Sequence, residues 1–290
     1  MPRRHILLFA IVFSVVLLVP GWSRAVDLDC AHPNVPANAV GQLTVDIGID
    51  CAPGGPVGIN IGRNGTLMMN GHTVSGNGVG GVLCDGGKCT VIGPGRIVGA
   101  PVGIYAPATP QLVVTGVDVS GNGWGIYQDA GKMRVTSVTA NDNEYGGIVG
   151  ERLILQQITA NNNGEVEEPQ SGIEGVTITA TDVTANGNQV AGISAGRRVK
   201  AINVTTNGNA LSGIQSSGAC RLNGATATGN QHGVACYAGV IDSSTLTDNT
   251  VADILAGPRG PRARNTTCDN SFRPSGSSFP GSPAGLCSSN

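Results

Sequence analysis

The amino-acid sequence predicts an all-β fold, a three-sided parallel β-helix of about ten coils. Three observations favour this fold class. A Gly followed by Ile or Val recurs every 20 to 25 residues, and such a period is typical of solenoids. Apolar and polar residues alternate ahead of each recurrence, as in strands that bury one face. Finally, 45 of the 290 residues are Gly and only 3% are aromatic, which is too few large side chains for an ordinary globular core.

Residues 1–25 have the pattern of a secretory signal peptide. Arg3 and Arg4 precede an apolar run, Ile6 to Val19, and small residues follow at Ser23 and Ala25. The run is too short to span a bilayer comfortably, so we expect cleavage after Ala25, with an uncleaved anchor as the alternative. The mature chain would keep 14 basic and 19 acidic residues, a net charge of −5. Nucleic acid is therefore not expected as a partner.

The eight cysteines also fit an exported protein, because disulfides persist in oxidising compartments. They fall into neighbouring couples, namely Cys30 with Cys51, Cys84 with Cys89, Cys220 with Cys236, and Cys268 with Cys287. The sequence alone leaves their connectivity open. No couple has the spacing of a zinc site, and no cofactor is predicted. We expect a secreted protein, extracellular or periplasmic, with no membrane span in the mature chain.

Three segments are predicted after the signal peptide. Residues 26–57 would form an N-terminal cap, residues 58–256 the β-helix, and residues 257–290 a C-terminal cap or tail rich in Pro, Gly and Ser. Caps are expected because an open solenoid end exposes unpaired strand edges, which promote aggregation.

Each coil is predicted to contain three short strands, placed by counting from a recurring Asn. Leu112 and Val114, ten and eight residues before Asn122, would point inward on the first strand. Val117 and Val119 would do so on the second strand, and the Gly-Ile step supplies the third strand. The recurring asparagines are Asn77, Asn122, Asn143, Asn163, Asn188, Asn209, Asn230 and Asn249.

These asparagines are interpreted as structural. Asn tolerates the left-handed backbone region better than most residues, so we expect it to occupy the turn before the third strand. Stacked at every coil, its side-chain amide can bind the next coil and form an asparagine ladder. The following Gly would let the backbone bend into the third strand.

The repeats resemble a known family. The stretch "NGHTVSG" from Asn70 to Gly76, the Gly-Ile coils that follow it and the tail closing on Cys287 resemble a secreted bacterial group with an "NGHTISG" signature. This group belongs to the right-handed parallel β-helix proteins of the pectate-lyase-like superfamily. The resemblance covers roughly residues 45–290 and implies a right-handed coil. It implies no single chemistry, because this fold carries lyases, hydrolases, epimerases, adhesins and inert spacers.

Basic residues gather on the outward side of the predicted first strands. This set, here called the basic strip, comprises Lys132, Arg134, Arg152, Arg197, Arg198, Lys200 and Arg221. It holds seven of the 14 basic residues of the mature chain, across five successive coils. Like charges stacked about 5 Å apart repel each other, and a polyanionic ligand would relieve that repulsion. The alternative is a solvated face whose cations pair with Glu151, Asp129 or Asp182.

The basic strip leads to the hypothesis that the protein binds an acidic polysaccharide or a cell-surface glycan. The enzymatic alternative is a polysaccharide lyase or epimerase that acts on a uronate-containing glycan, because the resemblance implies a sugar cleft on the first sheet. Such chemistry requires a cation, a base and an acid, and Lys200 could serve as the base. The sequence contains no catalytic signature of these enzymes, so no catalytic residue is assigned. A passive structural or adhesive cell-surface solenoid is the third hypothesis.

Two further features are interpreted as structural. His72 is expected to be a hydrogen-bonded packing residue. Arg96 and Asp118 interrupt a column of outward threonines and should form a surface ion pair between adjacent coils. The threonines of this column are Thr73, Thr139, Thr159, Thr184, Thr205, Thr226 and Thr245.

Two features carry alternative interpretations. The longest coil contains an acidic insertion, interpreted as a solvated loop, with a calcium site as the alternative. Its glutamates are Glu165, Glu167 and Glu168. Tyr105 and Tyr127 occupy equivalent outward positions on consecutive coils, with Trp124 nearby. These rings could stack on sugars or pack against each other.

Overall fold

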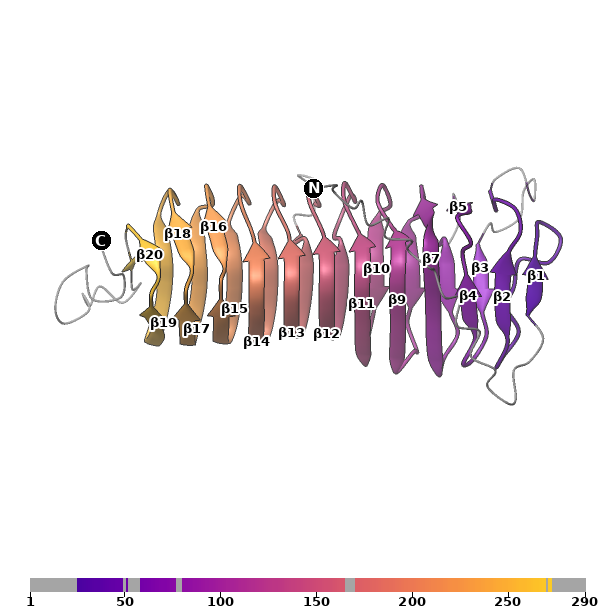
Figure 1. Ribbon diagram of the computed structural model, residues 1–290, viewed down its shortest axis with the longest axis horizontal. Helices are drawn as coiled ribbons and strands as arrows, with labels where there is room; N and C mark the ends of the chain where they lie inside the picture. The colour runs from indigo at the N-terminus through magenta and orange to yellow at the C-terminus, as the bar shows by residue number, and fades with distance from the viewer. Residues whose placement is uncertain are drawn as a thin grey trace, which may run out of the picture.

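The computed structural model describes residues 25–48, 51, 58–76, 80–164, 170–269 and 271–272. The chain winds into a rod whose strands stack in parallel along its long axis, from indigo β1 at one end to yellow β20 near the other (Figure 1). The protein is an all-β parallel solenoid of about ten turns, as the sequence predicts. The described residues contain no helix that could traverse a lipid bilayer. Of the predicted signal peptide, only Ala25 is among them.

The strands follow the chain order. They are β1 (Val26–Leu28), β2 (Val40–Leu43), β3 (Ile59–Ile61), β4 (Thr66–Met68), β5 (Thr73–Ser75), β6 (Val82–Cys84), β7 (Lys88–Val98), β8 (Val102–Ala106), β9 (Gln111–Asp118), β10 (Trp124–Gln128), β11 (Lys132–Thr139), β12 (Ile148–Thr159), β13 (Ile173–Thr184), β14 (Ala191–Thr205), β15 (Ser212–Asn223), β16 (Thr226–Thr228), β17 (His232–Asp242), β18 (Thr245–Thr247), β19 (Ala252–Arg264), β20 (Thr267–Cys268) and β21 (Ser271–Phe272). Each coil pairs in parallel with the coil before it and the coil after it, as β12 does with β11 and β13.

Three sheets surround the core, named first, second and third by the order of their strands in a coil. In the later coils the chain passes from one sheet to the next without leaving the strand conformation. Strand β13 contains a third-sheet segment (173–175), a first-sheet segment (177–181) and a second-sheet segment (183–184). Asp182 bends the chain between the last two with φ of 54°. Strand β13 therefore joins the third predicted strand of one coil to the first and second predicted strands of the next.

The core consists of columns of similar residues rather than a cluster of large ones. One column runs through consecutive first-sheet segments in parallel register. Its members are Leu112, Met133, Leu153, Ile178, Val199 and Cys220, all buried. Because each side chain packs on its equivalent in the next coil, the described core contains no aromatic side chain.

The recurring asparagines form the predicted ladder. From Asn122 to Asn249 they are buried, and each binds the next coil. Asn163, for example, donates from its backbone N–H and from Nδ2 to Oδ1 of Asn188, at 2.9 and 3.0 Å. The predicted first member, Asn77, lies outside the described residues.

The left-handed turn residue is not the ladder Asn, which corrects the sequence-based expectation. The residue before it has the positive φ, at 53° for Asp142 and 54° for Asn162. These two side chains are exposed, whereas Asn143 and Asn163 are buried. The ladder Asn must point inward to reach the next coil, so the bend falls on its solvent-facing neighbour. In several coils that neighbour is Gly, the least strained residue at positive φ.

The ladder ends at a carboxylate. Asn249 donates from Nδ2 to Oδ1 of Asp253 at 2.7 Å, and its backbone N–H donates to the same oxygen at 3.4 Å. The other carboxylate oxygen accepts the backbone N–H of Asp269 at 2.6 Å. Asp253 stands where the earlier coils have the Gly of the Gly-Ile step, and it is fully buried. One acidic side chain thus joins the last ladder Asn to the following coil.

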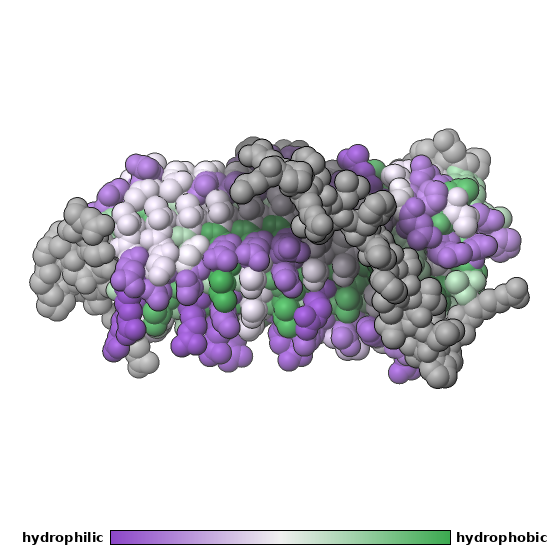
Figure 2. Space-filling model, in the orientation of Figure 1, coloured by the Kyte–Doolittle hydropathy of each residue, from purple (hydrophilic) through white to green (hydrophobic). Residues whose placement is uncertain are grey.

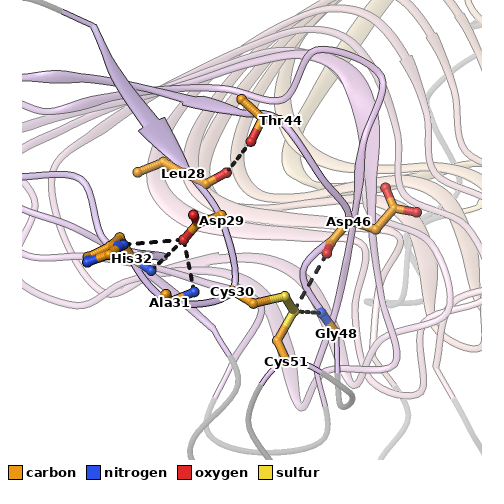
Figure 3. The surroundings of a disulfide bond; sticks show 9 residues. All are labelled: Leu28, Asp29, Cys30, Ala31, His32, Thr44, Asp46, Gly48 and Cys51. Atoms are coloured by element: carbon orange, nitrogen blue, oxygen red, sulfur yellow. Dashed lines mark hydrogen bonds and ion pairs between the residues drawn. A yellow bond between two sulfur atoms is a disulfide. The ribbon is translucent and has the colours of Figure 1, made fainter.

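Disulfides join the first three predicted cysteine couples. Cys30 is bonded to Cys51 near the N-terminal end, where the Cys51 sulfur also contacts Gly48 and Asp46 (Figure 3). Cys84 is bonded to Cys89, and Cys220 to Cys236. Cys268 is disulfide-bonded as well. Its predicted partner, Cys287, lies outside the described residues.

Parallel pairing reaches into the segments predicted to cap the solenoid. Strand β1 pairs with β2, and β2 pairs with β4. At the other end β19 pairs with β21. The division of the chain into a cap, a β-helix and a tail stays a prediction.

Replacing Asn188 with Ala should destabilise the protein strongly. The substitution removes both hydrogen bonds from Asn163, and the bonds from Asn188 Nδ2 to Ala160 O at 3.1 Å and to Asn209 Oδ1 at 2.9 Å. Because the remaining partners stay buried, we expect the free energy of unfolding to fall by about 3 kcal/mol. Denaturant unfolding measures it. The exposed neighbour Gln189, also replaced with Ala, is the control, and equal losses in both variants would contradict the ladder's role.

Replacing Gly208 with Ala should cost stability through backbone strain alone. Gly208 has φ of 62°, and a Cβ placed there meets nothing within 4 Å. An L-residue in this region costs about 1 kcal/mol, and Asn costs less because it tolerates the left-handed conformation. Thermal unfolding should therefore rank wild type above Gly208→Asn, and Gly208→Asn above Gly208→Ala. Identical melting temperatures for the two variants would contradict this.

Candidate functional site

The basic strip lies on the first sheet. Its members are on β11, β12, β14 and β15, and all are exposed. Figure 2, in the orientation of Figure 1, shows hydrophilic side chains gathered along the lower part of the front strands, with hydrophobic ones between them. The register accounts for part of this mixture, because Ile154 is the partner of Arg134.

The strip consists of two groups of cations separated by one coil. In the first group Lys132 pairs directly with Arg152. In the second group Lys200 pairs with Arg221. The intervening coil presents threonines in both columns, with Thr177 between Arg152 and Arg198. Arg197 lies beside Arg198, where the register between β13 and β14 shifts.

The ion pairs found in the described residues leave out the strip. They are His32 with Asp29, His72 with Asp46, and Arg96 with Asp118. The acids proposed as partners for the strip have other contacts. Glu151 accepts the N–H of Gly131 at 2.9 Å, Asp182 accepts Nδ2 of Asn203 at 3.2 Å, and Asp129 interacts with Tyr127. The described contacts therefore do not support the alternative in which these acids form ion pairs with the cations of the basic strip.

Two cations of the same surface were missed by sequence reasoning. Arg262 pairs with Val240, which in turn pairs with Arg221. Arg264 follows two residues later, on the same face of β19, and both are exposed. The sequence does contain a signal for them. Arg262, Ala263 and Arg264 ("RAR") repeat the alternation of basic and apolar residues at Lys132 to Arg134 ("KMR"). Val240 interrupts the column of cations, and both arginines fall in the segment that the sequence predicts to be the C-terminal cap or tail.

A second surface, here called the third-sheet groove, lies over the third sheet and its corner with the first. It has a volume of about 750 Å³ and crosses β10, β12, β13, β14, β15, β17 and β19. Its aromatic, acidic and amide lining includes Tyr127, Asp129, Glu151, Glu174, Gln215 and Tyr237. None of the basic-strip residues lines it.

The acids of this groove lie at one end. Burial raises the pKa of Glu174 above its ordinary value. Burial and the neighbouring Asp129 carboxylate both raise the pKa of Tyr127. At the same end, the almost fully buried Gln128 donates to Thr109 O, while its Oε1 has no hydrogen-bond partner among the described residues.

The scarce aromatic residues cluster beside this groove. Between residues 25 and 269 the sequence has five of them, at Tyr105, Trp124, Tyr127, Tyr145 and Tyr237. Tyr127 lies 5.9 Å from Tyr105 and 5.3 Å from Trp124, between ring centroids, and Trp124 stacks on Tyr145 at 5.4 Å. The rings therefore do pack against each other, and Tyr237 remains 44% exposed at the other end.

The structural interpretations of His72 and of the Arg96–Asp118 pair are confirmed. His72 Nδ1 lies 3.2 Å from Asp46 Oδ1. The N–H of Thr73 and this imidazole lower the pKa of Asp46. Arg96 Nε lies 3.6 Å from Asp118 Oδ2 in neighbouring coils. The threonine column is also in register from Thr139 onward, through Thr159, Thr184, Thr205, Thr226 and Thr245.

The alternative calcium site falls on residues that the structure does not describe, Glu165, Glu167 and Glu168. Within the described ranges, no three His, Cys, Asp or Glu side chains gather in a way that would hold a metal ion.

No family model matches the sequence, and no curated protein matches it. Among solved structures, the chain is similar to the crystal structure of the Dettilon tailspike protein, with a TM-score of 0.46 and 12% sequence identity. The match covers 88% of this chain and 55% of the tailspike chain, so this chain spans about half the length of that protein.

Glu174→Gln should stabilise the protein at neutral pH. The raised pKa means that the folded state disfavours the charged carboxyl, and Gln removes this cost. As the pH falls through the raised pKa and then the ordinary one, Glu174 becomes neutral in both folded and unfolded chains. The difference in melting temperature should then vanish. A stabilisation that persists in acid would show that the carboxylate charge is not its cause.

Proposed function

We propose that this protein is exported and binds an acidic polysaccharide through its basic strip. The observation that carries the proposal is the group of seven exposed cations that take part in none of the described ion pairs. The mature chain as a whole is acidic, so this clustering is not a consequence of composition. The disulfides support export, because such bonds persist outside the cytosol.

The arrangement suits a linear polyanion. Neighbouring coils are about 4.8 Å apart, so the two groups of cations lie one after the other along the rod axis, with the threonine coil between them. A chain of acidic sugars that lies parallel to the axis would meet cations in both groups, and the Arg262 and Arg264 side chains would extend the contact. Counterion release and charge neutralisation would then favour binding.

Membership of the pectate-lyase-like superfamily is part of this proposal. The "NGHTVSG" signature, the parallel coils and the asparagine ladder support it. Lyase or epimerase activity on the same glycan is the enzymatic alternative, and a passive rod is the structural one.

The double substitution Arg198→Glu and Lys200→Glu should weaken binding of alginate, pectate or hyaluronan by about tenfold or more at low salt. The loss follows from replacing two cations of the second group with like charges to the ligand. Surface plasmon resonance with the immobilised glycan measures it. Arg63→Glu, an exposed cation on an early coil, is the control and should change affinity little.

Two results would overturn the proposal. One is binding that neither the double substitution nor added salt weakens. The other is no binding to any of the three acidic glycans, which would favour the passive rod. Release of unsaturated sugars, followed by ultraviolet absorbance in the same samples, would replace simple binding with the lyase alternative.

A further inference from the structure

We propose that the third-sheet groove binds a linear, uncharged oligosaccharide, independently of the basic strip. Three properties of the groove lead to this ligand class: its length along the rod, the chemistry of its floor, and the aromatic rings at its two ends.

The groove has the shape for a polymer. Its lining comes from seven consecutive coils, β10 to β19. With strands about 4.8 Å apart, this span is roughly 29 Å along the axis. A compact metabolite would occupy a small part of it, whereas an extended chain of sugars would contact the lining of every coil.

Beyond its acidic end the floor is uncharged. Ser194 and Gln215 offer hydrogen-bonding groups in the middle of the groove, and Ala235 and Leu255 continue it as an apolar surface. Outward residues of the third sheet form one column in register, and its members in order are Tyr127, Val149, Glu174, Ser194, Gln215, Ala235 and Leu255. Gln215 Nε2 donates to Ser194 Oγ at 2.9 Å, which fixes the amide in the middle of the floor. The amide oxygen can still accept from a ligand hydroxyl.

Aromatic rings mark both ends of the groove. Tyr127 is held by Trp124 and Tyr105, and Tyr237 projects at the opposite end. The apolar faces of sugar rings stack on such side chains, while the tyrosine hydroxyls bind polar groups. Among the described residues Tyr237 takes part in none of the ring contacts and is 44% exposed, so ring packing does not account for its location.

The charge of the groove disfavours the acidic polysaccharide that we propose for the basic strip. The charged side chains of the lining are Asp129, Glu151 and Glu174, and none is basic. A polyanion would be repelled, whereas sugar hydroxyls can donate to carboxylate oxygens. The acids are confined to one end, which favours a neutral glycan over a basic peptide along the whole groove.

The test uses the mature protein and calorimetric titration with a panel of uncharged hexasaccharides built from glucose, mannose or xylose. We expect at least one to bind, with an affinity that salt and the Lys200→Glu substitution leave unchanged. Tyr237→Ala should lower that affinity about fivefold through the loss of ring stacking. Val251→Ala is the matched control, because Val251 is 49% exposed and does not line the groove.

A second variant blocks the groove without touching the ladder. Gly196 lines the groove, and a Cβ added there has its nearest neighbour at 3.8 Å. Gly196→Trp should therefore fold normally, fill the middle of the groove and abolish binding. Binding of an acidic glycan to the strip serves as its folding control.

Three outcomes would overturn the inference. No affinity for any uncharged hexasaccharide is the first. Equal affinity of the Tyr237→Ala, Gly196→Trp and wild-type proteins is the second. Salt-sensitive binding of hexalysine that Glu174→Gln abolishes, without binding of neutral sugars, is the third and would assign the groove to a basic peptide. Because strip binding is scored separately on acidic glycans, failure here is distinguishable from failure of the proposed function.

Discussion

Hydrogen bonding between buried asparagines sets the position of each coil on the next. A parallel stack of short strands has little else to fix its register against a slip of two residues, because inward side chains alternate along each strand and such a slip keeps apolar residues inside. A buried amide displaced from its partner would leave donors and acceptors unpaired, at about 1–3 kcal/mol each. The Asn163–Asn188–Asn209 contacts therefore impose one register on the whole stack.

That register converts residues far apart in sequence into continuous surfaces. The first sheet collects cations from β11, β12, β14 and β15, while the third sheet collects rings, amides and acids. The two surfaces share coils, but the basic strip of the first sheet consists of cations and the charged side chains of the groove are three acids at one end. A corner of the chain separates them, so each can vary without disturbing the inward residues that hold the coils together.

Counting along the sequence was sufficient where one residue type repeats at a regular interval. The spacing of Asn122 to Asn249 predicted the ladder and also placed Arg96 beside Asp118. It failed to locate the left-handed residue, because Asp142 and Asn143 are both compatible with that conformation and only burial separates their roles. The groove was not predicted either. Its walls depend on corners whose lengths differ between coils, as the register shift between Gly175 and Thr177 shows. Counting at a regular interval does not detect such differences.

The amide ladder has a direction. Every Asn accepts from the preceding coil and donates to the following one, until Asp253 supplies oxygens that only accept. Whole coils could be duplicated upstream of Asn249, since each copy would inherit one incoming and one outgoing bond. Duplication across Asp253 would instead place a carboxylate in the space of the next ladder Asn, because a Cβ at the equivalent Gly233 lies 2.8 Å from Asn249 Nδ2. Rod length can therefore evolve by internal gain of repeats, while its terminus remains fixed by a single side chain.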